Sequence, residues 1–334
     1  MKASAAKPEY SVYIVSGSTK YNITPAVDQI DFSDQENEFA QRVTIQVGNV
    51  QVGDSRLSDL LSVRNRVYIH ADDGTTEGEV YRGFLWDMNN KNSLTSKALQ
   101  LKCYDNLIYF QESDESVYFS SGKSTESVCS SLCDSWGVKL EYTYESITHS
   151  KLALRGYLAD IFTDDILPLV KDRTGKKYVI RSEKDVMKIM GVGENTTIYH
   201  FKAKKNVTQT SSSCTMDGVV TKVVILGKAD KNDREPVEAT VSGDTAKYGT
   251  LQKTINRDEN TTLTDSKKEA QSIIDEDGEP KWKYQLKAVD VPWIRKGDKI
   301  YADAGDLSGY YIVTGVDRTI TRKNRELVLE LEKP

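Results

Sequence analysis

Cysteine and histidine are scarce in this sequence, which argues against a disulfide scaffold and against a metal centre. Its 334 residues include four cysteines and three histidines. No two cysteines form a C-x-x-C pair, and the histidines lie far apart along the chain, so we expect no metal and no cofactor. Cys129 and Cys133 are spaced i and i+4 in a predicted helix, which indicates two buried apolar thiols on one face.

Long apolar runs are also missing. No window approaches the ~18 apolar residues that a membrane-spanning helix needs, and the opening MKASAAKPEY lacks the apolar core of a signal peptide. We therefore expect no membrane insertion. The sequence predicts a protein made and kept in a reducing cytoplasm, unless it leaves by lysis.

The motifs of common enzymes do not occur. There is no G-x-S-x-G, G-x-G-x-x-G or H-E-x-x-H. Gly122-Lys123-Ser124 precedes a predicted helix as in a P-loop, but the place of the first glycine holds Val117. A glycosidase-like carboxylate pair stays open on composition alone, although Asp164 and Asp165 are better explained as a solvated helix face. We predict no enzyme and no catalytic residue.

An excess of positive charge is absent as well. The net charge is −5 and the two signs are interspersed, so the sequence predicts no specific nucleic-acid binding. Tyrosine, by contrast, is abundant, with 18 residues against four tryptophans. This composition favours β-rich packing and contact between proteins over a buried cofactor.

Alternating strands dominate both ends of the chain. In the first part, residues 67–70 and 79–86 predict a hairpin around the turn Asp72-Asp73-Gly74. At the other end, residues 282–332 alternate at period two between turn-forming residues. Gly297, Gly309 and Gly315 interrupt this stretch as turn or bulge residues.

Helical spacing appears in the middle and once more near residue 270. Residues 126–136 predict a helix capped by Ser124 and ended by Gly137. Residues 157–172 predict a second helix, which Pro168 should kink or divide. Residues 264–275 predict a third helix, capped by Thr264 or Asp265.

These elements predict a β-rich α+β fold with two β-barrels and an inserted small α/β domain. We expect a first β-barrel in residues 1–110 and the inserted domain in residues 111–195. Residues 196–334 are expected to form a second β-barrel with one helix, unless part of this segment completes the first barrel. No sequence repeat of fixed period is visible.

The order of several short motifs resembles one known family. The motifs, in chain order, are EVYRGFLWDM (79–88), TGKKYVI (174–180), VVTKVVILGKAD (219–230), YGTLQKTI (248–255), TDSKKEAQSIIDEDGEP (264–280), VPWIRKGDKIYA (291–302) and SGYYIVTGVDRTIT (308–321). Together they resemble the central baseplate hub proteins of contractile phage tails. That superfamily includes the late control protein D type and Mu-like hubs, and this chain looks most similar to the PBSX-like prophage branch.

The resemblance implies a structural role. Such hubs form homotrimers whose two tube-protein-like β-barrels per subunit build a pseudo-sixfold ring, which joins the sixfold tail tube to the threefold spike. The implied partners are further copies of the chain, the tail tube protein, the central spike protein, and other baseplate and tape-measure components. The implied location is the baseplate of a virion or tail-like particle, a bacteriocin included. A tail-associated cell-wall hydrolase or carbohydrate-binding module remains the alternative.

Overall fold

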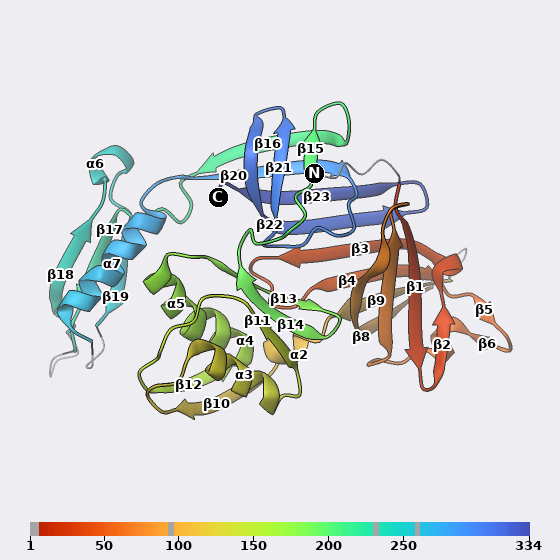
Figure 1. Ribbon diagram of the computed structural model, residues 1–334, viewed down its shortest axis with the longest axis horizontal. Helices are drawn as coiled ribbons and strands as arrows, with labels where there is room; N and C mark the ends of the chain where they lie inside the picture. Colours follow the sequence, from red (N-terminus) through yellow and green to blue (C-terminus); the bar gives the residue numbers. More distant parts are fainter. Residues whose placement is uncertain (1–6, 93–96, 230–233, 258–260) are drawn as a thin grey trace. The chain divides into compact units, whose positions relative to one another are not determined.

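Figure 1 shows the computed structural model, which describes residues 7–92, 97–229, 234–257 and 261–334. Contacts divide the chain into two compact units: Met1–Ser211 with Tyr284–Pro334, and Ser212–Lys283. Each unit is described by itself. The division at residues 110 and 195 stays a prediction.

One large, mainly antiparallel sheet organises the first unit (Figure 1). Its path runs β16-β20-β23-β22-β3-β4-β9-β8-β7-β1-β2, while β21 pairs with β22 and carries β15 at its other edge. The strands are β1 (Glu9–Ser16), β2 (Thr19–Asn22), β3 (Val27–Gln35), β4 (Arg42–Gly48), β7 (Arg66–Asp72), β8 (Glu77–Asn92), β9 (Lys97–Tyr104), β15 (His200–Lys202), β16 (Val207–Thr215), β20 (Lys281–Val289), β21 (Lys299–Ala304), β22 (Leu307–Thr321) and β23 (Arg325–Glu332).

The two halves of this sheet repeat one strand order. The N-terminal half runs β3-β4-β9-β8-β7-β1, and the C-terminal half runs β16-β20-β23-β22-β21-β15. Each half encloses its own core: Val12, Ile45 and Leu101 are buried in the first, and Phe201, Tyr311 and Leu329 in the second. The β-rich fold class with two barrel-like halves is therefore confirmed.

Short elements connect the strands of the N-terminal half. They are η1 (Thr24–Ala26), β5 (Gln51–Val52), β6 (Ser55–Arg56), α1 (Leu57–Leu60) and α2 (Ile108–Gln111). The hairpin predicted around Gly74 is confirmed as β7 and β8, both longer than expected. Its turn is closed by Asp72 and Asp73, whose carboxylates accept backbone N–H groups from Gly74 and Thr75.

A small α/β domain lies between β9 and β15 along the chain. It consists of β10 (Asp114–Phe119), α3 (Thr125–Ser135), β11 (Lys139–Tyr142), β12 (Leu152–Tyr157), α4 (Leu158–Asp160), the π-helical turn η2 (Ile161–Ile166), α5 (Leu167–Thr174), β13 (Tyr178–Glu183) and β14 (Val186–Gly191). The Ser124 hydroxyl caps α3 by accepting the N–H of Ser127 at 3.2 Å, as predicted. Cys129 and Cys133 are free and buried in this domain's core.

The second unit is a three-stranded sheet packed against one long helix. It contains β17 (Lys222–Leu226), β18 (Val237–Ser242), α6 (Thr245–Tyr248), β19 (Gln252–Asn256) and α7 (Leu263–Asp277). Val223 and Ile225 of the sheet pack on Ala270 and Ile274 of α7. The helix predicted at residues 264–275 is confirmed as α7, but its N-cap is Thr262 and not Thr264 or Asp265. The last residue of the motif at 219–230 lies outside the described residues.

The alternation over residues 282–332 predicts strands throughout, but the segment VPWIRKGD (291–298) is not extended. The next strand, β21, begins only at Lys299. Gly297 has a φ of +84°, which ends strand geometry there. No helix among the described residues combines the length and apolarity that crossing a membrane requires.

Candidate assembly site at the junction of the two halves

The two halves meet where β3 pairs with β22. The pairing is antiparallel and runs from Gln35 opposite Gly315 to Gln29 opposite Thr321. Gly315 lies at a bulge in β22, and a Cβ there would come within 2.0 Å of the Gln35 side-chain oxygen. The glycine therefore leaves room for the Gln35 side chain, and the bulge confirms its prediction as a turn or bulge residue.

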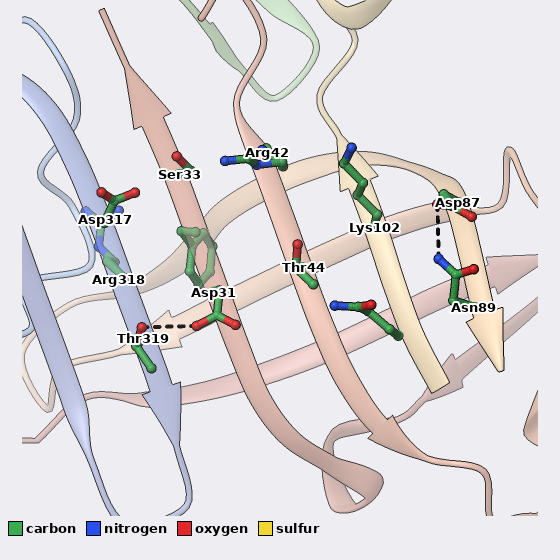
Figure 2. Close-up of a pocket in the computed structure, with 12 residues that line it drawn as sticks. Asp31, Ser33, Arg42, Thr44, Asp87, Asn89, Lys102, Asp317, Arg318 and Thr319 are labelled. Carbon is green, nitrogen blue, oxygen red and sulfur yellow. Dashed lines mark hydrogen bonds between the residues drawn. The ribbon is translucent and has the colours of Figure 1, made fainter. Parts of the chain in front are cut away.

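Polar side chains cover one face of this junction. The Thr319 hydroxyl donates to Asp31 at 3.0 Å, and the Gln35 amide donates to Asp317 at 3.0 Å. Figure 2 shows a shallow hollow that continues from here over the neighbouring strands. Its lining comes from β22, β3, β4, β9 and β8: Asp31, Phe32, Ser33, Arg42, Thr44, Asp87, Asn89, Gln100, Lys102, Asp317, Arg318 and Thr319.

The charges on this face are mixed, with carboxylates slightly in excess. Asp31, Asp87 and Asp317 contribute carboxylates on the face, and Arg42 and Lys102 contribute the partly exposed basic groups. Carboxylates interspersed with bases repel a polyanion and give it no continuous row of cations to bind.

Buried charges lie on the opposite side of β3. Asp34 is fully buried, and its carboxylate receives the Arg295 Nε at 2.6 Å and lies 3.8 Å from the Lys296 Nζ. Burial alone would raise the pKa of Asp34, but Arg295 and Lys296 hold it well below its ordinary value. Lys296 also donates to the backbone carbonyls of Gln35 and Glu38.

A second buried pair secures β22. Arg318 donates from Nε to Asp290 at 3.1 Å, and both side chains are almost completely shielded from solvent. The Tyr10 hydroxyl of β1 donates to the same carboxylate. One acid of the C-terminal half is thus shared with the N-terminal half.

The inserted domain is bound to the same segment. Arg181 of β13 forms an ion pair with Asp298 at 2.8 Å, and Arg295 donates to the carbonyl of Ser182 at 3.1 Å. At Gly297 a Cβ would meet the Val179 side chain at 2.6 Å. Residues 290–298 therefore contact both halves and the inserted domain, which makes this segment the structural joint of the first unit.

The sequence predicts no site residue, and the two acids weighed for a hydrolase lie elsewhere. Asp164 and Asp165 are exposed on η2. Partial burial of the Asp165 carboxyl, with help from the charge of Asp164, raises the pKa of Asp165. The buried acid at the junction had a visible signal, because Asp34 follows Ile30 and Phe32 on the apolar side of an alternating strand. Among the described residues, no group of histidine, cysteine and acidic side chains could hold a metal ion.

Two repeated half-sheets around an inserted α/β domain define the fold of a phage tail protein. The 43 kDa tail protein of prophage MuSo2 from Shewanella oneidensis superposes with a TM-score of 0.71 at 11% identity, covering 98% of this chain and 99% of that one. The tail protein from Neisseria meningitidis MC58 gives 0.71 at 12% identity, covering 97% and 96%. The predicted resemblance to tail hub proteins is confirmed in fold.

The chain belongs to the YQBQ-like family, whose model matches residues 32–332. The fold also extends to secretion systems. The Escherichia coli c3393 protein, a component of the type VI secretion system described as similar to T4 tail proteins gp27 and gp5, matches with a TM-score of 0.56 at 8% identity, covering 92% of this chain and 74% of that one. A sequence comparison with curated proteins finds no match.

Proposed function

We propose that this protein is a non-enzymatic baseplate hub of a phage tail or tail-like particle. Three copies would form a ring in which six half-sheets meet a sixfold tail tube on one side and a threefold spike on the other. The tail-protein fold supports the particle as its location. In this proposal residues 1–110 and 196–334 supply the ring, and residues 111–195 decorate it.

The observation that carries the proposal is the repeated strand order within one continuous sheet. A trimer can match a hexamer only if each subunit offers two similar surfaces. This chain offers them already joined, through β3 and β22. The mixed-charge face of that junction would line the channel (Figure 2).

Further partners follow from this position in the particle. The tail tube protein would stack on the ring, the spike protein would bind its other side, and tape-measure and other baseplate components would contact it. The fold shared with the E. coli c3393 protein, which is described as similar to the T4 tail proteins gp27 and gp5, supports contact with further tail components. We propose neither membrane insertion nor specific DNA binding.

The direct test is the mass of the protein in solution and its place in the particle. Native mass spectrometry should detect a trimer, and antibody labelling in electron micrographs should mark the baseplate end of the tail. A protein that stays monomeric and never copurifies with tube or spike proteins would overturn the proposal. Digestion of peptidoglycan that is lost in an Asp164→Asn and Asp165→Asn double variant would instead favour the hydrolase.

A further inference from the structure

Several strand edges of the large sheet have no partner strand among the described residues, those of β2 and β15 included. Two others bear on assembly: part of β8, and β16 beyond the isolated bridge between Val207 and Ala203. On β8, the edge facing β7 is paired only as far as Phe84, whereas the other edge continues along β9 to Asn92. The second half of β8, from Asp87 onward, therefore has one free edge. The strand β16 ends the sheet path, paired on one side with β20.

The long strands β8 and β22 occupy equivalent places with the same register. Pairing of β22 with β21 stops at Ile312, and a bulge follows between Val313 and Gly315. Pairing of β8 with β7 stops at Phe84, and a bulge follows between Leu85 and Asp87. Phe84 thus corresponds to Ile312, and Asp87 to Gly315.

The turns that precede these strands repeat the same hydrogen bonds. Gly297 (φ +84°) donates its N–H to the carbonyl of Val313, and Arg64 (φ +68°) donates to that of Leu85. The side chains of the next residues close both turns: Asp298 accepts the N–H of Arg295 at 3.0 Å, and Asn65 accepts that of Ser62 at 2.8 Å. The two turns therefore repeat the same pattern of hydrogen bonds next to the bulge.

The repeated strand order predicts which strand pairs with the free edge of β8. In the C-terminal half, the edge of β22 after the bulge holds β3, the first strand in the order of the N-terminal half. The strand in the corresponding place of the C-terminal half is β16. Building on the proposed function, we infer that β8 from Asp87 onward pairs antiparallel with residues 207–211 of β16 in a second copy of the chain.

Exposure and charge fit this pairing. Arg318, opposite β3 in the formed junction, is buried, whereas the corresponding Asn90 of β8 is exposed. The β16 edge is unprotected, since residues 207–216 (VTQTSSSCTM) contain no charged residue and no proline. Each copy offers one edge of each kind, so the contact is head-to-tail, the kind that forms a ring when the rotation between copies closes.

Disulfide trapping tests the pairing in the full-length protein. The exposed Cys214 is first replaced by serine, since the other three cysteines are buried. Lys91→Cys on β8 is then combined in turn with a cysteine at each of residues 208–211 on β16. The matched control is Gln46→Cys, an exposed position on β4, which is paired on both sides.

We expect mild oxidation to link copies through Lys91→Cys with alternate β16 positions, giving covalent dimers and trimers on non-reducing gels. The Gln46→Cys series should stay unlinked. A trimer by native mass spectrometry that gives no Lys91 cross-link would overturn the pairing but leave the hub proposal intact. A protein that is monomeric at all concentrations would overturn both.

Discussion

At the scale of single residues, Arg318 and Asp290 carry opposite charges that are almost wholly removed from water. Removing one partner of such a pair leaves an uncompensated charge, which costs about 3–5 kcal/mol. We expect Arg318→Met to lower the free energy of unfolding by that amount in urea titrations. Arg322→Met is the control, because its pair with Asp28 is exposed and worth about 1 kcal/mol or less. Equal losses in both variants would contradict the expectation.

Asp105 should make stability depend on pH. Its carboxylate accepts the N–H groups of Gln41 and Leu107, each at 3.0 Å, and burial raises its pKa to about 7. In the unfolded chain the pKa is about 4. Between these values the folded state keeps a proton that the unfolded state has lost, so this group's stabilisation falls as pH rises from about 4 to about 7.

Asp105→Asn removes that titration. We expect the unfolding free energy of the variant, measured relative to the natural protein, to improve steadily from pH 5 to pH 7 in urea titrations. Asp34 adds no pH dependence between pH 5 and pH 7. Because its pKa is lowered in the folded protein, the stabilisation from its ionised carboxylate is lost only at pH below about 4. A difference between the two proteins that is constant with pH would show that Asp105 does not titrate there.

At the scale of elements, Gly297 is the tightest point of the joint at residues 290–298. An alanine there would have to adopt a positive φ, and its Cβ would also clash with the side chain of Val179. We expect Gly297→Ala to cost more than the ~1 kcal/mol of a left-handed residue alone and to loosen the inserted domain, visible as faster amide exchange in β13. Gly53→Ala, also at positive φ but with open space around it, isolates the backbone cost.

Sequence patterns predicted the elements well wherever the deciding contacts are local. Ser124 caps α3 because its hydroxyl reaches an N–H only three residues on. Residues 291–298 lie in an alternating stretch but form no strand, because their conformation depends on remote groups, Asp34 and Arg181 among them. The repeat of the two halves is not visible as a sequence repeat for a similar reason. Ser62–Asn65 and Arg295–Asp298 share backbone hydrogen bonds but almost no residue types.

At the scale of the whole molecule, residues 212–283 form a compact unit with a core of their own. Along the chain they connect β16 to β20, whereas the corresponding strands of the N-terminal half, β3 and β4, are joined only by the short loop 36–41. We expect replacement of residues 217–279 by a loop of that kind to leave the first unit folded, with a melting temperature by circular dichroism within a few degrees of the natural protein. An insoluble or unfolded product would show that the two units need one another.

The polar junction face should determine how the assembled protein treats DNA. Asp31→Lys with Asp317→Lys converts its carboxylates to cations, so we expect DNA binding that weakens steeply with salt, while the natural protein shows none in the same electrophoretic shift assay. Asp164→Lys with Asp165→Lys makes the same change of charge on the inserted domain and is the matched control. Stronger binding by the control would place the channel elsewhere.

The pairing of β3 with β22 has a consequence for synthesis. Thr319 and Asp31 bond across 288 residues of sequence, so the ribosome must finish nearly the whole chain before β3 gains its second neighbour. At about 5–20 residues per second, the nascent chain exposes that edge for tens of seconds. Ribosomes that follow one another on the same message would hold several such edges close together, where unpaired edges of neighbouring chains can pair with one another.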